Sequence, residues 1–262
     1  MNSFYYLVLV YLILIYTTIL ISKRFGIYDV PNKRKIHSEN IVNTAGISLY
    51  IFLLIIVSVY EFSYEIELII SYGIFLVLFG FIDDRVSMHA SIKLVCIIFP
   101  SIFLILNGFE LKDLGNYEYF GIIGLGKFSI IFTLLSVGLL INSYNYVDGI
   151  DGLLSSLTIS TIIYIICIID NENVVNILML FIIPLVINLI FNLFPKSSGL
   201  KIFLGDCGSL FLGFFISFLI IYIYKFEKIH PGYLIWACWY PIYDFLYVTF
   251  KRLRNKRNFY EA

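Results

Sequence analysis

Five aspartates, Asp83, Asp84, Asp148, Asp151 and Asp206, lie where long apolar stretches of the chain end. An ionised carboxylate is costly at or near hydrocarbon, so it is retained where it faces protein, water, a metal or a substrate. If the chain crosses a membrane in the order derived below, all five carboxylates open on the same side. The pattern therefore indicates a shared catalytic surface.

The segment 142–153 carries the sharpest pattern. It contains two Asp-Gly steps three residues apart, which predict a break in a helix. Asn145, Asp148 and Asp151 recur at every third residue, so any helical portion presents them on one side. Their oxygens suit Mg²⁺, or hydrogen bonds to a base and a ribose. The alternative is an ordinary interhelical loop, which does not need two aspartates between apolar helices.

Two further acidic segments adjoin apolar stretches. Asp83 and Asp84 are adjacent, and like charges at a helix end repel unless a metal, a basic side chain or a bound phosphate's Mg²⁺ offsets them. Lys93 follows near the membrane boundary. Asp206 lies among glycines at the start of a span, where backbone N–H groups left free favour a phosphate. The alternatives are a solvated helix end with Arg85 as counter-ion, and an N-cap aspartate beside packed glycines.

The loop 29–37 combines a basic cluster with a histidine, His37. A basic cluster beside a span attracts anionic lipid, and this alone is an alternative explanation for the lysines and arginine. It does not explain the histidine that follows the cluster.

The composition is that of an all-α, polytopic transmembrane protein, with 60% hydrophobic and 14% charged residues. About nine apolar runs are each long enough to cross a hydrocarbon core as a helix. They are predicted at about 3–22, 44–60, 67–82, 92–107, 127–145, 153–170, 174–194, 207–224 and 232–250. The four cysteines lie in or beside these runs without CxxC spacing, so we interpret them as small apolar residues.

The distribution of lysine and arginine predicts the orientation. Loops reached after odd-numbered spans hold 14 of the 18 basic residues. This places the N-terminus outside and the basic loops, with the five aspartates, in the cytoplasm.

Taken in order, the acidic segments resemble the polyprenyl-phosphate N-acetylhexosamine-1-phosphate transferases of glycosyltransferase family 4. This membrane family starts peptidoglycan, teichoic acid, O-antigen and related glycans. The resemblance covers nearly the whole chain. The matching segments are Asp29-Val30-Pro31 with Arg34-Lys35-Ile36-His37, Gly80-Phe81-Ile82-Asp83-Asp84, Asn145-Tyr146-Val147-Asp148-Gly149-Ile150-Asp151-Gly152-Leu153, Phe203-Leu204-Gly205-Asp206-Cys207-Gly208-Ser209-Leu210 and Trp239-Tyr240-Pro241-Ile242-Tyr243-Asp244.

The resemblance implies a reaction at the cytoplasmic face of the cell membrane. The phosphate of membrane-embedded polyprenyl (undecaprenyl) phosphate attacks the β-phosphorus of a UDP-N-acetylhexosamine, and UMP leaves. No nucleic acid is implied, and a homodimer is left open. The site roles carried over are Mg²⁺ (or Mn²⁺) ligands for Asn145 and Asp206, a place near the lipid phosphate for Asp83 and Asp84 with one as a base, the nucleotide pocket for Asp148 and Asp151, and phosphate or nucleotide contacts for His37 and Lys93.

The spacing between Asn192 and Lys201 is more similar to the branch serving surface polysaccharide than to muramoyl-pentapeptide transferases. The chain is expected to be one domain, 1–262, that lacks the family's C-terminal histidine motif and last span or spans. A catalytically impaired homologue or assembly partner is therefore a second hypothesis. A transporter is a third, and it predicts carboxylates near the span midplanes.

Overall fold

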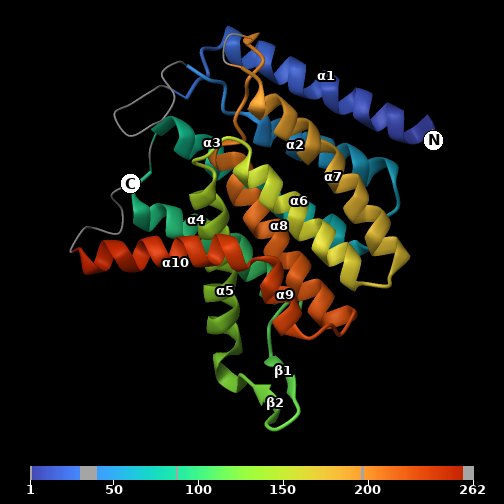
Figure 1. Ribbon diagram of the computed structural model, residues 1–262, viewed down its shortest axis with the longest axis vertical. Coiled ribbons are helices and arrows are strands. Elements are labelled where there is room, and N and C mark those ends of the chain that lie inside the picture. Colours follow the sequence, from blue (N-terminus) through green and yellow to red (C-terminus); the bar gives the residue numbers. More distant parts are fainter. Residues whose placement is uncertain (1, 30–39, 87, 196–197, 256–262) are drawn as a thin grey trace.

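The computed structural model describes residues 2–29, 40–86, 88–195 and 198–255, and they form a helical bundle (Figure 1). The helices are α1 Asn2–Arg24, α2 Ala45–Val59, α3 Tyr64–Val86, α4 Ala90–Leu106, α5 Ser129–Val147, α6 Leu153–Ile168, α7 Glu172–Leu193, α8 Gly205–Phe226, α9 Pro231–Ala237 and α10 Trp239–Arg254. A short 3-10 turn, η1 Gly126–Phe128, precedes α5. The strands β1 Asp113–Tyr117 and β2 Gly121–Gly124 form an antiparallel hairpin.

The helices have the lengths and compositions of membrane spans. Within the described residues, α1, α3, α5 with its preceding turn, α7 and α8 are long and apolar enough to cross a membrane. Helices α2, α4 and α6 are also apolar but shorter. The chain is therefore a polytopic helical membrane protein, as its composition predicts.

Helix α8 is the centre of the bundle and packs most extensively against α3 and α5. Its most apolar window is 83% buried, far more than that of any other candidate span among the described residues. The Phe215 ring stacks on Phe181 of α7 with centroids 4.3 Å apart, and Phe211 meets Tyr50 of α2 edge-on at 5.3 Å. A helix buried on all sides must be apolar all round, which explains why α8 shows no polar face.

Glycines allow the start of α8 to touch its neighbours backbone to backbone. A Cβ added to Gly46 of α2 would lie 2.3 Å from the Gly208 nitrogen, and one added to Gly80 of α3 would lie 2.3 Å from the Cys207 nitrogen. Real Cβ atoms do not approach other atoms this closely. Small residues at helix crossings permit such contact inside membranes.

Backbone hydrogen bonds also join the start of α2 to the start of α8. The Ala45 and Gly46 amides donate to the carbonyls of Phe203 and Leu204 at 3.0 and 3.1 Å. The Phe203 amide in turn donates to Val42 at 2.8 Å. The segments before α2 and α8 therefore hold each other in a single register.

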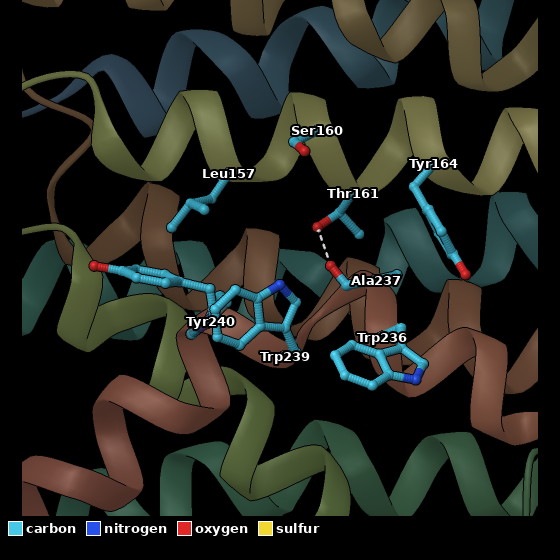
Figure 2. A pocket seen from close by; sticks show the side chains of 9 residues that line it. Leu157, Ser160, Thr161, Tyr164, Trp236, Ala237, Trp239 and Tyr240 are labelled. Atoms are coloured by element: carbon cyan, nitrogen blue, oxygen red, sulfur yellow. Dashed lines mark hydrogen bonds between the residues drawn. The ribbon is translucent and has the colours of Figure 1, made fainter.

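The predicted span 232–250 is not one helix. The chain turns at Cys238 between α9 and α10, and α10 lies across α5 instead of parallel to it (Figure 1). Pro241 has no N–H to donate to the Ala237 carbonyl one turn earlier. That carbonyl accepts the Thr161 hydroxyl of α6 at 2.8 Å, beside an open pocket of about 390 Å³ flanked by Trp236 and Trp239 (Figure 2).

The hairpin is an addition to the all-α prediction. It projects below α5, at the end opposite the connection from α5 to α6 (Figure 1). The Tyr224 hydroxyl of α8 bonds to the Asp113 carboxylate at its base. The hairpin is therefore attached to the end of α8 that lies away from Asp206.

We predict that Gly46→Ala destabilises the protein by about 1–3 kcal/mol, the usual cost of overpacking, because the new methyl meets the α8 backbone. Thermal unfolding in detergent, followed by tryptophan fluorescence, measures this as a lower Tm. Gly138→Ala in α5 is the matched control, since its Cβ would meet nothing nearer than Ile97 at 4.0 Å. Equal Tm values for the two variants would contradict the packing argument.

Candidate functional site

The start of α8 carries Asp206 into contact with the end of α3. The Asp206 amide donates to Oδ2 of Asp84 at 3.1 Å. Residue 205 must be glycine here, because its φ is +69° and a Cβ would lie 2.3 Å from the Asn43 carbonyl oxygen and 2.7 Å from Asp84 Oδ2. The prediction that the N–H groups at this helix start are free is therefore wrong for Asp206, whose amide is capped by Asp84.

Asn145 connects α5 to the same point. Its side-chain nitrogen donates to Asp206 Oδ1 at 2.9 Å and to the Ser209 hydroxyl at 2.8 Å. Ser209 was not among the predicted site residues. Its position three residues after Asp206 on a helix could have identified it, since such residues share a face. The Asn145 amide thus orients the Asp206 carboxylate.

Asp83 is buried and its charge is offset. Its carboxylate forms an ion pair with Lys93 of α4 and accepts the Met88 amide at 2.7 Å. Its side chain is 3% exposed, whereas that of Lys93 is 43% exposed. Arg85, the counter-ion considered from the sequence, instead donates to the Asn43 side chain at 3.3 Å. The ammonium group beside the carboxylates is therefore that of Lys93.

Asp148 ends α5 on the same side of the bundle. Burial raises its pKa well above the usual range, and the carboxylates of Asp206, Asp84 and Asp29 raise it further. Asp29 was part of the first motif but had no predicted role. These electrostatic neighbours place four aspartates from separate segments around one region.

Asp151 has a different environment. The helical repeat that begins with Asn145 ends at Val147, so the predicted helical face does not extend to residue 151. The Asp151 carboxylate pairs with the buried Lys201 instead. The next amide, at Gly152, donates to the Asn192 side chain at 2.5 Å. The structure thus brings together Asp83, Asp84, Lys93, Asn145, Asp148 and Asp206. It pairs Asp151 with Lys201 instead. His37 lies outside the described residues.

The end of α10 reaches this region as well. The Arg252 guanidinium donates to the Tyr146 hydroxyl at 2.7 Å and lies over the Tyr146 ring at 5.3 Å. Tyr146 follows Asn145 in sequence. The sequence predicts no role for Arg252 or Tyr146, because a cation–π contact between distant segments leaves no local signal.

The oxygen donors of this site fit a hard divalent cation. The carboxyl groups of Asp83 and Asp206 lie within hydrogen-bonding reach, and two carboxylates this close repel unless a proton or a cation lies between them. No set of three His, Cys, Asp or Glu side chains in ligating positions occurs among the described residues. Mg²⁺ does not require one, because it is commonly bound through one or two carboxylates with waters and substrate phosphates.

Comparisons with known proteins indicate the family of the chain. A sequence profile described as Glycosyl transferase family 4 matches residues 66–224. Over 249 residues the chain is 28% identical to the undecaprenyl-phosphate alpha-N-acetylglucosaminyl 1-phosphate transferase of Escherichia coli O157:H7, covering 90% of the chain and 66% of the relative.

Two other relatives give similar values. Identity is 30% over 257 residues with the Salmonella typhi transferase of the same description, covering 93% of the chain and 70% of the relative. It is 27% over 244 residues with the probable undecaprenyl-phosphate N-acetylglucosaminyl 1-phosphate transferase of Bacillus subtilis (strain 168), covering 90% and 67%. The chain spans about two thirds of the length of these curated relatives.

The raised pKa of Asp148 predicts a pH-dependent stability. In the unfolded chain an aspartate ionises near pH 3.9, whereas the folded protein holds Asp148 protonated to a higher pH. The folded state therefore loses stability as pH rises from about 3.9 through the folded pKa. Asp148→Asn stays neutral, so we expect its Tm to exceed that of the wild type at neutral pH and the difference to vanish toward pH 4.

The control for this measurement is Asp170→Asn, at an exposed position just after α6. Its Tm should follow the wild type at every pH. A constant Tm difference between Asp148→Asn and the wild type across the pH range would show that ionisation of Asp148 has no part in it.

Proposed function

The chain belongs to glycosyl transferase family 4, and from this premise we propose that it transfers an N-acetylhexosamine 1-phosphate from a UDP-linked sugar to polyprenyl phosphate, releasing UMP. The single observation that carries the proposal is the contact set at the start of α8. There Asp206 meets Asp84 and Asn145, from α3 and α5, at 3.1 and 2.9 Å. The names of the relatives specify undecaprenyl phosphate and N-acetylglucosaminyl 1-phosphate.

The proposed reactants are polyanions, so a site rich in carboxylates needs cations to receive them. Asp206 and Asp83 are the residues best placed to hold Mg²⁺, with Asn145 fixing the Asp206 carboxylate through its amide. When bound, Mg²⁺ would neutralise charge on the pyrophosphate of the nucleotide sugar. Phosphoryl transfer depends mainly on such neutralisation and on positioning.

Lys93 and Asp83 have separate proposed roles toward the acceptor phosphate. Lys93 is partly exposed beside a buried carboxylate, so its ammonium group can meet an incoming phosphate while it offsets Asp83. Asp83 does not need to remove a proton from the acceptor. A phosphate monoester with a second pKa near 6 is largely dianionic at neutral pH and is already a nucleophile.

Asp148 and Asp151 are proposed for the nucleotide. Asp151 lies at the exposed turn before α6, where its half-exposed carboxylate, held by the buried Lys201, can receive a polar ligand from the aqueous side. Burial and the neighbouring carboxylates raise the pKa of Asp148, and in its protonated form it can donate a hydrogen bond as well as accept one.

The proposed active face is the cytoplasmic one, with the N-terminus outside. The uneven distribution of lysine and arginine supports this orientation, since 14 of 18 fall on the proposed inner side. Basic residues do gather at the carboxylate end. Lys23 donates to the Gly199 carbonyl at 2.6 Å, and Arg252 bonds to Tyr146.

For activity, membranes containing the chain are incubated with Mg²⁺, undecaprenyl phosphate and labelled UDP-N-acetylhexosamines. We expect a labelled lipid and UMP. Asp206→Ala should reduce the rate by at least about a hundredfold, as expected when a major electrostatic contact of the transition state is lost. Asp206→Asn preserves the size of the side chain and should be similarly impaired, which separates lost charge from lost packing.

Asp170→Ala is the activity control, since residue 170 is exposed at the far end of α6. Unfolded variants are excluded by their Tm. Full activity in folded Asp206→Ala would refute the role of that carboxylate. No product from any UDP-N-acetylhexosamine with the folded wild-type chain would refute the proposed function.

The orientation has its own test in chains with one exposed cysteine, in which Cys96, Cys207 and Cys238 stay buried. Cys167 is the exposed thiol among the four native cysteines, so Cys167→Ser is the background variant. Either Asp170→Cys or Ser198→Cys is then added, at exposed positions on opposite ends of the bundle. A membrane-impermeant maleimide should label residue 170 in intact cells and residue 198 only after the membrane is opened. The reverse pattern would place the active face outside.

A further inference from the structure

The β1–β2 hairpin exposes an apolar tip at the end of the molecule away from the carboxylates. Tyr119 is 89% exposed and Phe120 is 80% exposed. Ile122 on β2 is 69% exposed. Large apolar side chains clustered this openly mark a surface that contacts something other than water.

The tip is exposed because the rest of the hairpin is held in place. The Asp113 carboxylate accepts the Tyr224 hydroxyl of α8. The Tyr117 ring meets His230 edge-on with centroids 4.8 Å apart, and Gly115 lies directly against Pro231. One side of the hairpin is therefore anchored to the α8–α9 connection, and the tip cannot fold back to bury its aromatic rings there.

The length of α5 indicates the depth of the hairpin in the bilayer. Its 19 residues rise about 28 Å, close to the thickness of a hydrocarbon core of about 30 Å. Val147 lies at the carboxylate end, so Ser129 lies near the opposite boundary of the core. The Leu125 amide donates to the Lys112 carbonyl at 2.9 Å and closes the base of the hairpin just before that boundary.

An exposed apolar stripe continues from this base along α5. Phe128, Ile131 and Leu135 are 71, 56 and 68% exposed and recur at the spacing of one helix face. On a membrane-spanning helix such a face contacts lipid. The hairpin tip lies beyond the start of α5, at the end of the bundle where this lipid-facing stripe begins (Figure 1). It carries tyrosine and phenylalanine, and tyrosine is enriched where bilayers meet water.

We propose that the hairpin tip, defined as Tyr119, Phe120 and Ile122, inserts into the head-group region of the leaflet opposite the carboxylate site. It acts there as an interfacial anchor. The partner is the lipid surface itself. Glu118 at the tip is compatible with this depth, because a single carboxylate can remain in the hydrated head-group layer. The anchor fixes the height of α5 and α8 in the bilayer, since both are attached to the hairpin.

Spin labels test this depth without measuring any activity, so failure of the transferase proposal leaves the result unaffected. In the Cys167→Ser background, a nitroxide is attached to Phe120→Cys or Ile122→Cys, and the full chain is reconstituted in phosphatidylcholine vesicles. Accessibility to oxygen, which concentrates in lipid, is compared with accessibility to a water-soluble nickel chelate. We expect a severalfold higher oxygen-to-nickel ratio at 120 and 122 than at Asp170→Cys.

Asp170 is the matched control because it is exposed and lies outside the hairpin but at the same end of the bundle. Its neighbour Asn171 donates to the Glu227 carboxylate at the end of α8 at 2.9 Å. Equal ratios at 120, 122 and 170 would place the tip in water and overturn the proposal. Protection of 120 and 122 from both reagents would show a protein contact, such as a second copy of the chain, and would overturn it as well. The exposed tip makes these substitutions compatible with folding, and Tm confirms it for each variant.

Discussion

The site depends on one close approach, between the start of α8 and the adjoining parts of α2 and α3. Gly46 and Gly80 remove the side chains that would separate these backbones, and Gly205 has the positive φ that lets the chain enter α8 beside Asp84. Backbone hydrogen bonds from the start of α2 then fix the register. Because Asp206 directly follows Gly205, the packing that builds the bundle also sets the position of the central carboxylate.

This approach concentrates like charges, and the surrounding groups offset them one by one. Asp83 receives an ammonium group, Asp84 a backbone amide and Asp206 a side-chain amide. Asp148 is raised in pKa and can remain neutral. Each offset is partial, and this supports the proposal that a cation joins these carboxylates when the substrate binds.

The sequence predicts the helices well, because an apolar run of span length has few other stable conformations in lipid. It also predicts that the acidic segments meet at one end, since alternating spans return the chain to the same side. It does not predict their partners. Asp83 forms its ion pair with Lys93 and not with the nearby Arg85, and Asp151 forms one with Lys201. These pairings depend on distances set by tertiary packing.

The departures from the predicted spans share a physical cause. Hydropathy measures transfer into lipid and does not register a missing hydrogen bond, so it predicts one helix over 232–250 although the sequence contains Pro241. In the structure the freed Ala237 carbonyl is satisfied by Thr161 from another helix, and the chain turns where that donor is available. The hairpin was missed for the converse reason. Its glycines and exposed aromatic residues carry no regular alternation, and it is ordered by Tyr224 and by the α8–α9 connection. Local patterns therefore suffice for elements that the bilayer stabilises, whereas elements completed by a distant side chain require the fold.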